Sequence, residues 1–165
     1  MRLDLRAVVL ATAFTLGLVP GTALAKGTFK GTFGDVKFKA KKYAVSCSYV
    51  GSLQFLNLAG STSKRHGRYQ AGVGASGYGP SPTAPGAVFP IVLTGAVATF
   101  FSGEGPNPPL WGGNSGLGDP VVITITGVKR GKVIGTLDAT LREGASPTGA
   151  PIHGSAAFAA KCSSL

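Results

Sequence analysis

The chain has 165 residues and a formal net charge of +10, and 13% of its residues are charged, whereas 26 of them are glycine. This length accommodates one domain with a real core but not comfortably two. Sparse charge together with many Gly, Thr and Val residues favours an all-β domain over a helical one. Two histidines and two cysteines, with no CxxC pair, leave no basis for a metal site, and no motif points to a cofactor.

The first predicted element is a secretory signal peptide over residues 1–25. A short charged start precedes an apolar run from Ala7 to Leu18, and Ala23-Leu24-Ala25 has the small-x-small pattern of a cleavage site. The apolar run is shorter than the roughly 20 residues that span a bilayer, and no cysteine follows for lipidation. We therefore expect cleavage after Ala25 and a single secreted or periplasmic domain over residues 26–165, without a transmembrane segment.

Two strands joined by a tight turn are predicted at the start of this domain. Phe29 and Phe33 share one face of the first strand by period-two alternation, and Gly34-Asp35 has the composition of a turn. In the second strand, lysines alternate with Phe38 and Ala40 and therefore share the opposite face. These lysines are Lys37, Lys39 and Lys41. The alternation shifts parity after the last of them, which indicates a bulge or a break before the next strand.

The next segments are predicted as a strand and a basic loop. Residues 51–60 are predicted as a strand in which Leu53, Phe55 and the neighbouring leucines pack. Residues 61–68 are polar and basic, and their positive charges are Lys64, Arg65 and Arg68. We expect this loop to offer contacts to an anionic partner.

The middle of the chain combines apolar strands with glycine- and proline-rich loops. A short strand over 69–75 is followed by an apolar stretch over 88–101, in which Pro90 indicates an edge strand or a bulge. The segment 102–120 is the longest irregular one and carries the only tryptophan, Trp111. Loops of this length are usually functional or disordered, so Trp111 is a candidate either for stacking on a sugar ring or for capping the core.

Three alternating segments at the C-terminal end predict an antiparallel meander. They cover 121–128, 132–141 and 152–162, and their inward positions carry apolar residues. The last inward position is Cys162, and the other cysteine of the chain is Cys47. Since export exposes thiols to an oxidising space, we expect a Cys47–Cys162 disulfide between an early strand and the last one.

The fold expected from these elements is a single antiparallel β-sandwich, and the sequence leaves a closed β-barrel open as the alternative. The segments VKFKAKKYAVS, SLQFLNL, VVITITG, GTLDATL and HGSAAFAAKC together resemble small uncharacterised bacterial exported or lipoprotein β-sandwich domains. This resemblance implies an exported β-sandwich and carries over no functional residue. The chain lacks the lipidation cysteine of the lipoproteins, which puts surface anchoring in doubt.

The basic residues carry the main functional hypothesis. Lysines spaced by two on one strand face repel each other unless solvent or an anion screens them. One interpretation is that they protect an edge strand against aggregation. The other is a footprint for an anionic polysaccharide, lipopolysaccharide or another polyanion, with no motif specific for nucleic acid. The candidate ligand-binding residues are Lys37, Lys39, Lys41, Lys64, Arg65, Arg68 and Trp111.

Two rival functions remain open at this point. A small secreted hydrolase would use the acids Glu104 and Asp119 of the 102–120 segment, although both are also typical of turns. A self-assembling surface or fibre subunit would donate the apolar segment 88–101 to the sheet edge of another copy. The spacing of acids, histidines and hydroxyls selects no catalytic triad, so we expect a binding or structural envelope protein rather than an enzyme.

Overall fold

An all-β architecture is seen in the computed structural model, which describes residues 27–42, 44–64, 68–146 and 148–163. The predicted all-β class is confirmed, since the described chain forms an antiparallel sheet of eleven strands that is nearly closed into a barrel-like shape. The predicted signal peptide lies outside the described residues. In the part of the chain that the structure describes, no helix has the length and apolar character needed to cross a membrane. The elements are β1 (Gly27–Phe33), β2 (Val36–Lys42), β3 (Val45–Val50), η1 (Gly51–Leu53), β4 (Phe55–Lys64), β5 (Tyr69–Tyr78), β6 (Ile91–Val92), β7 (Thr94–Glu104), β8 (Leu110–Asn114), η2 (Ser115–Leu117), β9 (Val121–Lys129), β10 (Lys132–Glu143) and β11 (Pro151–Ala160).

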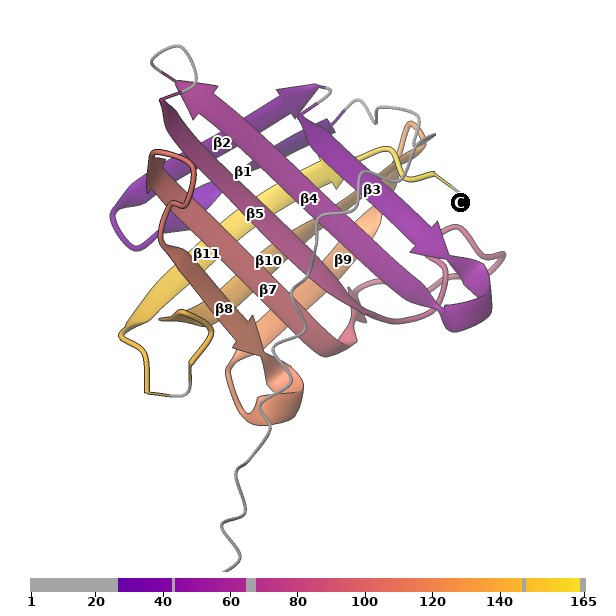
Figure 1. Ribbon diagram of the computed structural model, residues 1–165. Helices are drawn as coiled ribbons and strands as arrows, with labels where there is room; N and C mark the ends of the chain where they lie inside the picture. The colour runs from indigo at the N-terminus through magenta and orange to yellow at the C-terminus, as the bar shows by residue number, and fades with distance from the viewer. Residues whose placement is uncertain (1–26, 43, 65–67, 147, 164–165) are drawn as a thin grey trace, which may run out of the picture.

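The sheet folds into two layers whose strands cross (Figure 1). Along the sheet the order is β2-β1-β11-β10-β8-β7-β5-β4-β3, and β9 pairs with β10 and with the short β6. In Figure 1, β3, β4, β5, β7 and β8 form the front layer, and β1, β2, β9, β10 and β11 form the rear layer. The long strand β10 pairs with β9 and β11 of the rear layer, and its last residues, Arg142 and Glu143, pair with β8. This corner joins the two layers, as in orthogonally packed sheets.

The core lies between the two layers and is built from alternate residues of the long strands. The inward positions predicted for the C-terminal meander are buried, including Ile123, Leu137 and Phe158, except Ile152, which is half-buried. Aromatic rings join the layers, because the Phe100 ring of β7 stacks on the Phe33 ring of β1 with the centroids 4.5 Å apart. Period-two alternation is therefore confirmed as the pattern that separates core from surface in these strands.

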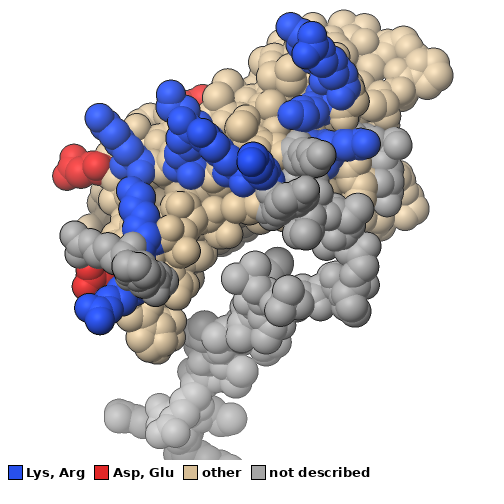
Figure 2. Space-filling view, turned by 90° about the horizontal axis from the view of Figure 1, so that it is seen from above, with Lys and Arg blue, Asp and Glu red and all other residues tan. Residues whose placement is uncertain are grey.

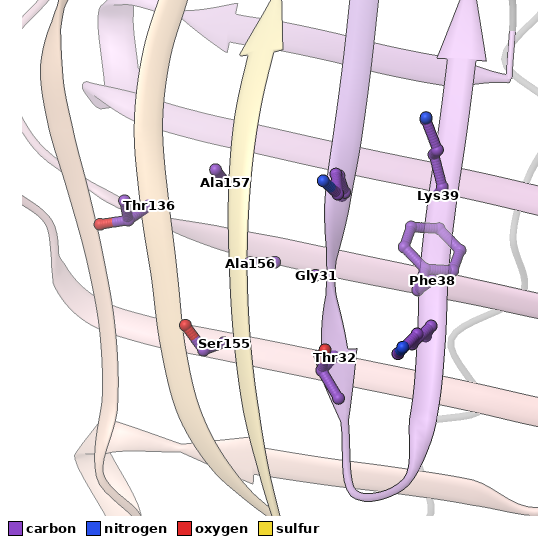
Figure 3. Close-up of a pocket in the computed structure, with 10 residues that line it drawn as sticks. Gly31, Thr32, Phe38, Lys39, Thr136, Ser155, Ala156 and Ala157 are labelled. Atoms are coloured by element: carbon purple, nitrogen blue, oxygen red, sulfur yellow. The ribbon is translucent and has the colours of Figure 1, made fainter.

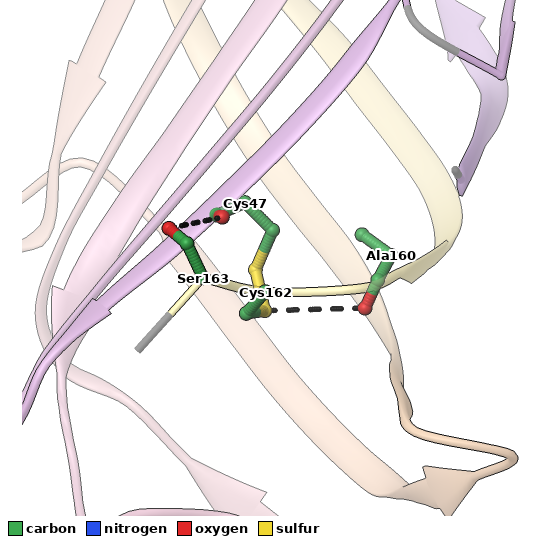
Figure 4. Close-up of a disulfide and its surroundings, with 4 residues drawn as sticks. All are labelled: Cys47, Ala160, Cys162 and Ser163. Carbon is green, nitrogen blue, oxygen red and sulfur yellow. Dashed lines mark hydrogen bonds between the residues drawn. A yellow bond between two sulfur atoms is a disulfide. The ribbon is translucent and has the colours of Figure 1, made fainter. Parts of the chain in front are cut away.

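The predicted Cys47–Cys162 disulfide is present and joins β3 of the front layer to the segment after β11 (Figure 4). The two Cα atoms are 4.4 Å apart, although the residues are 115 positions apart in the sequence. Beside the disulfide, the Ser163 N–H donates to the Cys47 carbonyl at 3.0 Å, and the Tyr49 N–H donates to the Ser163 carbonyl at 3.2 Å. A disulfide that ties the end of the chain to an early strand is compatible with a compartment outside the cytoplasm.

The prediction for residues 51–60 is confirmed for the neighbouring leucines and is wrong for Leu53. This segment begins with the 3-10 turn η1, and the Leu53 side chain is 64% exposed. The following strand β4 buries Leu56 and Leu58 as expected, and Phe55 at its start is half-buried. Gln54 has a left-handed conformation, with φ of 48°, and redirects the chain between the turn and the strand. The alternation therefore does not continue from Leu53 into the strand.

Several predicted loops contain more strand than expected. β4 extends through the predicted loop 61–68 as far as Lys64, and β5 continues to Tyr78. The predicted irregular segment 102–120 contains the end of β7, all of β8 and the 3-10 turn η2. Polar and glycine-rich strands show little apolar alternation, so a pattern of hydrophobic residues does not reveal them.

The apolar segment 88–101 is paired within the chain. Pro90 follows a cis peptide bond with Phe89 and precedes the two-residue strand β6, which agrees with the edge strand predicted at this proline. The rest of the segment belongs mainly to β7, which pairs with β5 on one side and with β8 on the other. The segment expected to act as the donor strand of a self-assembling subunit is thus already held on both sides.

Candidate anion-binding face

The lysine face is the outer surface of the β1–β2 hairpin and consists of Lys30, Lys37, Lys39 and Lys41. Gly34 supplies the left-handed conformation of the hairpin turn, with φ of +53°, at no steric cost. The resulting register places Lys30 directly opposite Lys39 across the two strands. Since the residues between these lysines point into the core, all of the lysine side chains are exposed on one side.

Repulsion between like charges dominates the electrostatics of the lysine face. The pKa of Lys39 lies below its usual value of 10.5, mainly because of the Lys41 charge and to a lesser degree because of desolvation and the Lys30 charge. Among the described residues, no carboxylate forms an ion pair with a lysine of this face. By strand pairing, the acidic residues nearest to the lysine face are Asp35, in the hairpin turn, and Asp138, on β10. The lysine face therefore carries unbalanced positive charge, which an anion would neutralise.

Positive side chains extend beyond this hairpin over one side of the molecule. Figure 2 shows the Lys and Arg side chains as a band across that side, with few Asp or Glu side chains among them. A second basic cluster lies on the β9–β10 hairpin, where Lys129 and Lys132 are cross-strand partners beside Arg130 in the turn. This hairpin thus carries three positive charges of its own, separate from the lysine face on β1 and β2.

A shallow trough of about 660 Å³ lies beside the lysine face (Figure 3). Its lining includes Lys37 and Lys39 and continues onto the outer surfaces of β11 and β10. These two strands contribute the small side chains of Thr136, Ser155 and Ala157, which leave room above the sheet. The trough thus combines ammonium groups on one flank with a flat floor of small residues.

The predicted basic loop lies on the other layer or outside the described chain. Arg65 is not among the described residues. Lys64 ends β4, and its Nζ atom lies 6.0 Å from the centre of the Tyr69 ring. Arg68 directly precedes β5. Lys64 and Arg68 therefore belong to the front layer, whereas the lysine face belongs to the rear layer.

Trp111 packs against the core. Its half-buried side chain on β8 stacks on the Phe100 ring, with the centroids 5.9 Å apart. Phe100 in turn stacks on Phe33, so Trp111 continues an interior row of rings. The lysine face lies on the outer surface of the opposite layer, and the structure does not bring Trp111 to it. Of the two roles considered for Trp111, capping of the core matches this position.

The acids considered for a hydrolase lie at opposite ends of the β7–β8 pair. Asp119 accepts hydrogen bonds from the Asn114 N–H at 3.2 Å and from the Arg142 Nε–H at 3.1 Å. Asn114 pairs with Val97 near the start of β7, whereas Glu104 ends the same strand, about 23 Å further along. Glycosidase carboxylates lie within about 10 Å of each other, so the structure does not bring these two together. Among the described residues, no group of three or more His, Cys, Asp and Glu side chains is placed to hold a metal ion.

Sequence reasoning misses the trough residues Thr136, Ser155 and Ala157. Alternation predicts that they point outward, but their position beside the lysines depends on the pairing of β11 with β1. In that pairing Lys30 lies opposite Ala157, and Ala157 lies opposite Thr136 on the far side. The small size of the outward-facing residues of the last strand predicts a flat surface there. It does not predict that this surface lies beside the lysines of β1 and β2.

No family model, no curated protein and no solved structure matches this chain. The function is therefore inferred from the geometry and the charges of its own residues, and the resemblance to exported β-sandwich domains stays a prediction.

The Lys39→Gln variant is expected to melt at a higher temperature than the wild type at low ionic strength. The substitution removes the charge that Lys41 and Lys30 repel, and salt screens this repulsion, so the gain is expected to shrink at about 1 M NaCl. Calorimetric melting of both proteins over a salt series measures the effect. A variant that melts below the wild type at low salt would contradict the repulsion.

The difference in melting temperature between Lys39→Gln and the wild type is also expected to depend on pH. The pKa of Lys39 is lowered in the folded protein, so the unfolded chain keeps this proton to higher pH than the folded protein does. The stability of the wild type is therefore expected to increase as the pH rises from the lowered pKa towards 10.5. The variant lacks this gain, so the difference between the two melting temperatures is expected to narrow over that range. Tyr49, whose pKa burial raises, titrates in both proteins and cancels in the comparison.

Proposed function

We propose that this protein is an exported, non-enzymatic binding protein that holds an anionic polymer on the lysine face. The observation that carries the proposal is the adjacency of Lys30, Lys37, Lys39 and Lys41, none of which has a described carboxylate as an ion-pair partner. A polyanion relieves several like-charge repulsions at once and releases the counterions that screened them, and this release favours binding.

An anionic polysaccharide or lipopolysaccharide suits the trough better than a nucleic acid does. The aromatic side chain in the trough lining, Phe38, is 1% exposed, so bases find no ring on which to stack. The hydroxyl groups of Thr136 and Ser155 are placed to bond sugar hydroxyls, and both strands keep the floor flat. Lysine ammonium groups act as point charges that take carboxylates, sulfates or phosphates in many orientations.

Export supports the same class of ligand. Residues 1–25 have the pattern of a signal peptide, and the Cys47–Cys162 disulfide is of a kind that persists in oxidising compartments. A periplasmic or secreted protein shares its compartment with lipopolysaccharide and acidic polysaccharides.

Binding to heparin, used as a sulfated polysaccharide probe, is expected to weaken steeply as salt rises, because counterion release drives it. Replacing Lys37, Lys39 and Lys41 together by glutamine is expected to weaken binding by about a hundredfold at physiological salt. Isothermal titration calorimetry at several salt concentrations measures both the affinity and its dependence on salt. The slope of log affinity against log salt is negative, and it is expected to become shallower by about two in the variant.

The matched control removes the same number of positive charges from the β9–β10 hairpin, by Lys129→Gln, Arg130→Gln and Lys132→Gln. This variant is expected to keep most of the heparin affinity. Equal losses in the two variants would mean that net charge alone attracts the polymer and would contradict a site on β1 and β2. An affinity that does not change with salt, or no binding at all, would contradict the proposed anion-binding function. The lysines would then serve to protect the edge strand β2 against aggregation.

A further inference from the structure

The outer surface of the front layer, which we name the neutral face, differs in chemistry from the lysine face. Every outward-facing residue of β3, β4, β5, β7 and β8 is apolar, a glycine, a hydroxyl residue or an amide residue. Lys64 and Glu104, at the ends of β4 and β7, have the parity of the inward-facing residues. In a chain with a net charge of +10, a layer of strands without an outward charge is suited to an uncharged ligand.

An aromatic pair lies at one end of the neutral face, with Tyr78 exposed and Phe55 half-buried. The rings of Phe55 and Tyr78 lie on neighbouring strands with centroids 5.0 Å apart and an interplanar angle of 55°. The Tyr78 side chain is 50% exposed and lies over Gly95, where a Cβ atom would sit 3.3 Å from the ring. The absence of a side chain at Gly95 therefore leaves room for the tyrosine ring, half of which remains exposed.

Unused hydrogen-bonding groups follow this pair along the strands. Asn57 lies two residues after Phe55 on β4, and Ser76 lies two residues before Tyr78 on β5, and the two are cross-strand partners. Ser48 pairs with Asn57 from the other side and completes the row. Within the described chain, none of the side chains of Ser48, Asn57 and Ser76 makes a hydrogen bond. The row lies about 7 Å from the aromatic pair, which is two residues of strand.

We propose that the neutral face binds an uncharged glycan, with one sugar ring stacked on Tyr78 and Phe55 and the next bonded by Asn57, Ser76 and Ser48. A pyranose combines an apolar C–H face with a rim of hydroxyl groups, and the site offers an exposed ring pair beside amide and hydroxyl groups at about the length of one sugar unit. Aromatic rings with a polar rim are the usual way to bind amphipathic ligands. The absence of outward charge removes the competing attraction for ions.

This site is separate from the lysine face and does not rest on the function proposed above. The lysine face lies on the outer surface of β1 and β2, and the aromatic pair lies on the outer surface of β4 and β5 in the other layer. Binding of an uncharged chain releases no counterions, so its affinity is expected to stay the same when salt changes. The two sites can therefore be tested in one protein without confusion.

The test uses affinity electrophoresis in native gels that contain hydroxyethylcellulose, galactomannan or soluble starch as neutral glycan probes. At least one of the three is expected to retard the wild-type protein. Tyr78→Ala is expected to weaken that binding by about tenfold, and Asn57→Ala by about fivefold. Tyr78→Phe keeps the ring and is expected to retain most of the affinity. The Lys37, Lys39 and Lys41 triple variant is expected to bind these probes as the wild type does.

The controls separate stacking from damage to the fold. Val122→Ala removes an exposed apolar side chain from β9 in the rear layer and is expected to leave binding unchanged. Melting curves show whether Tyr78→Ala remains folded, as expected for a half-exposed residue. Retardation by none of the probes would overturn the proposal, and so would equal binding by Tyr78→Ala and the wild type. A dimer in light scattering that Tyr78→Ala dissociates would assign the aromatic pair to a contact between copies and would also overturn it.

Discussion

Replacing Cys47 and Cys162 together by alanine is expected to lower the free energy of unfolding by about 4–5 kcal/mol. The disulfide closes a loop over 115 positions, and a longer loop removes more conformational entropy from the unfolded chain. It also ties the segment after β11 to β3, where Ser163 bonds the backbone of both Cys47 and Tyr49. Urea denaturation under oxidising conditions, followed by circular dichroism, measures the loss.

Reduction of the wild-type protein provides the control for this prediction, since it opens the same loop without changing a side chain. Reduced wild type is expected to unfold at nearly the same urea concentration as the double variant. If the double variant and the oxidised wild type unfold at the same urea concentration, the disulfide contributes nothing to stability and the prediction is wrong.

Phe100→Ala is expected to destabilise the fold by about 3–5 kcal/mol. The ring is 1% exposed and lies between Phe33 of the rear layer, with centroids 4.5 Å apart, and Trp111 of β8, at 5.9 Å. It also meets the edge of the Phe38 ring at 6.4 Å. Removing it opens a cavity between the two layers that a β-sheet cannot close by local rearrangement. Urea denaturation measures the change in free energy.

The neighbouring residue gives a matched control for the position of the ring. Phe101→Ala removes the same side chain one residue further along β7, where it points outward and covers Gly72. Its expected cost is about 1 kcal/mol, because the ring is only partly removed from water. Similar losses in the two variants would show that the row of rings through Phe100 does not hold the layers together.

The alternation of the sequence predicts which residues of the long strands face the core, and it does so well where apolar residues carry the period. Val121, Ile123 and Ile125 are buried as expected, and Cys47 and Cys162 lie on inward positions that allow the disulfide. The prediction fails at Leu53, because the left-handed residue Gln54 separates it from the strand that follows. It also misses β8, whose glycines carry no pattern.

The candidate sites were predicted only in part, because a strand pattern says which way a residue points but not which strand lies beside it. The sequence places Lys37, Lys39 and Lys41 on one face, since their spacing alone decides this. It leaves open that Lys30 faces Lys39, because this depends on the register of the hairpin.

What the sequence by itself determined is the class of the fold, the inner face of its main strands and the pair of cysteines available for a disulfide, because all of these follow from residue type and local spacing. Only the tertiary structure decided that the last strand lies beside the lysines, that Trp111 points to the core and that Tyr78 lies exposed on the neutral face. These neighbours are brought together by pairing between strands far apart in the chain, and no local pattern specifies that pairing.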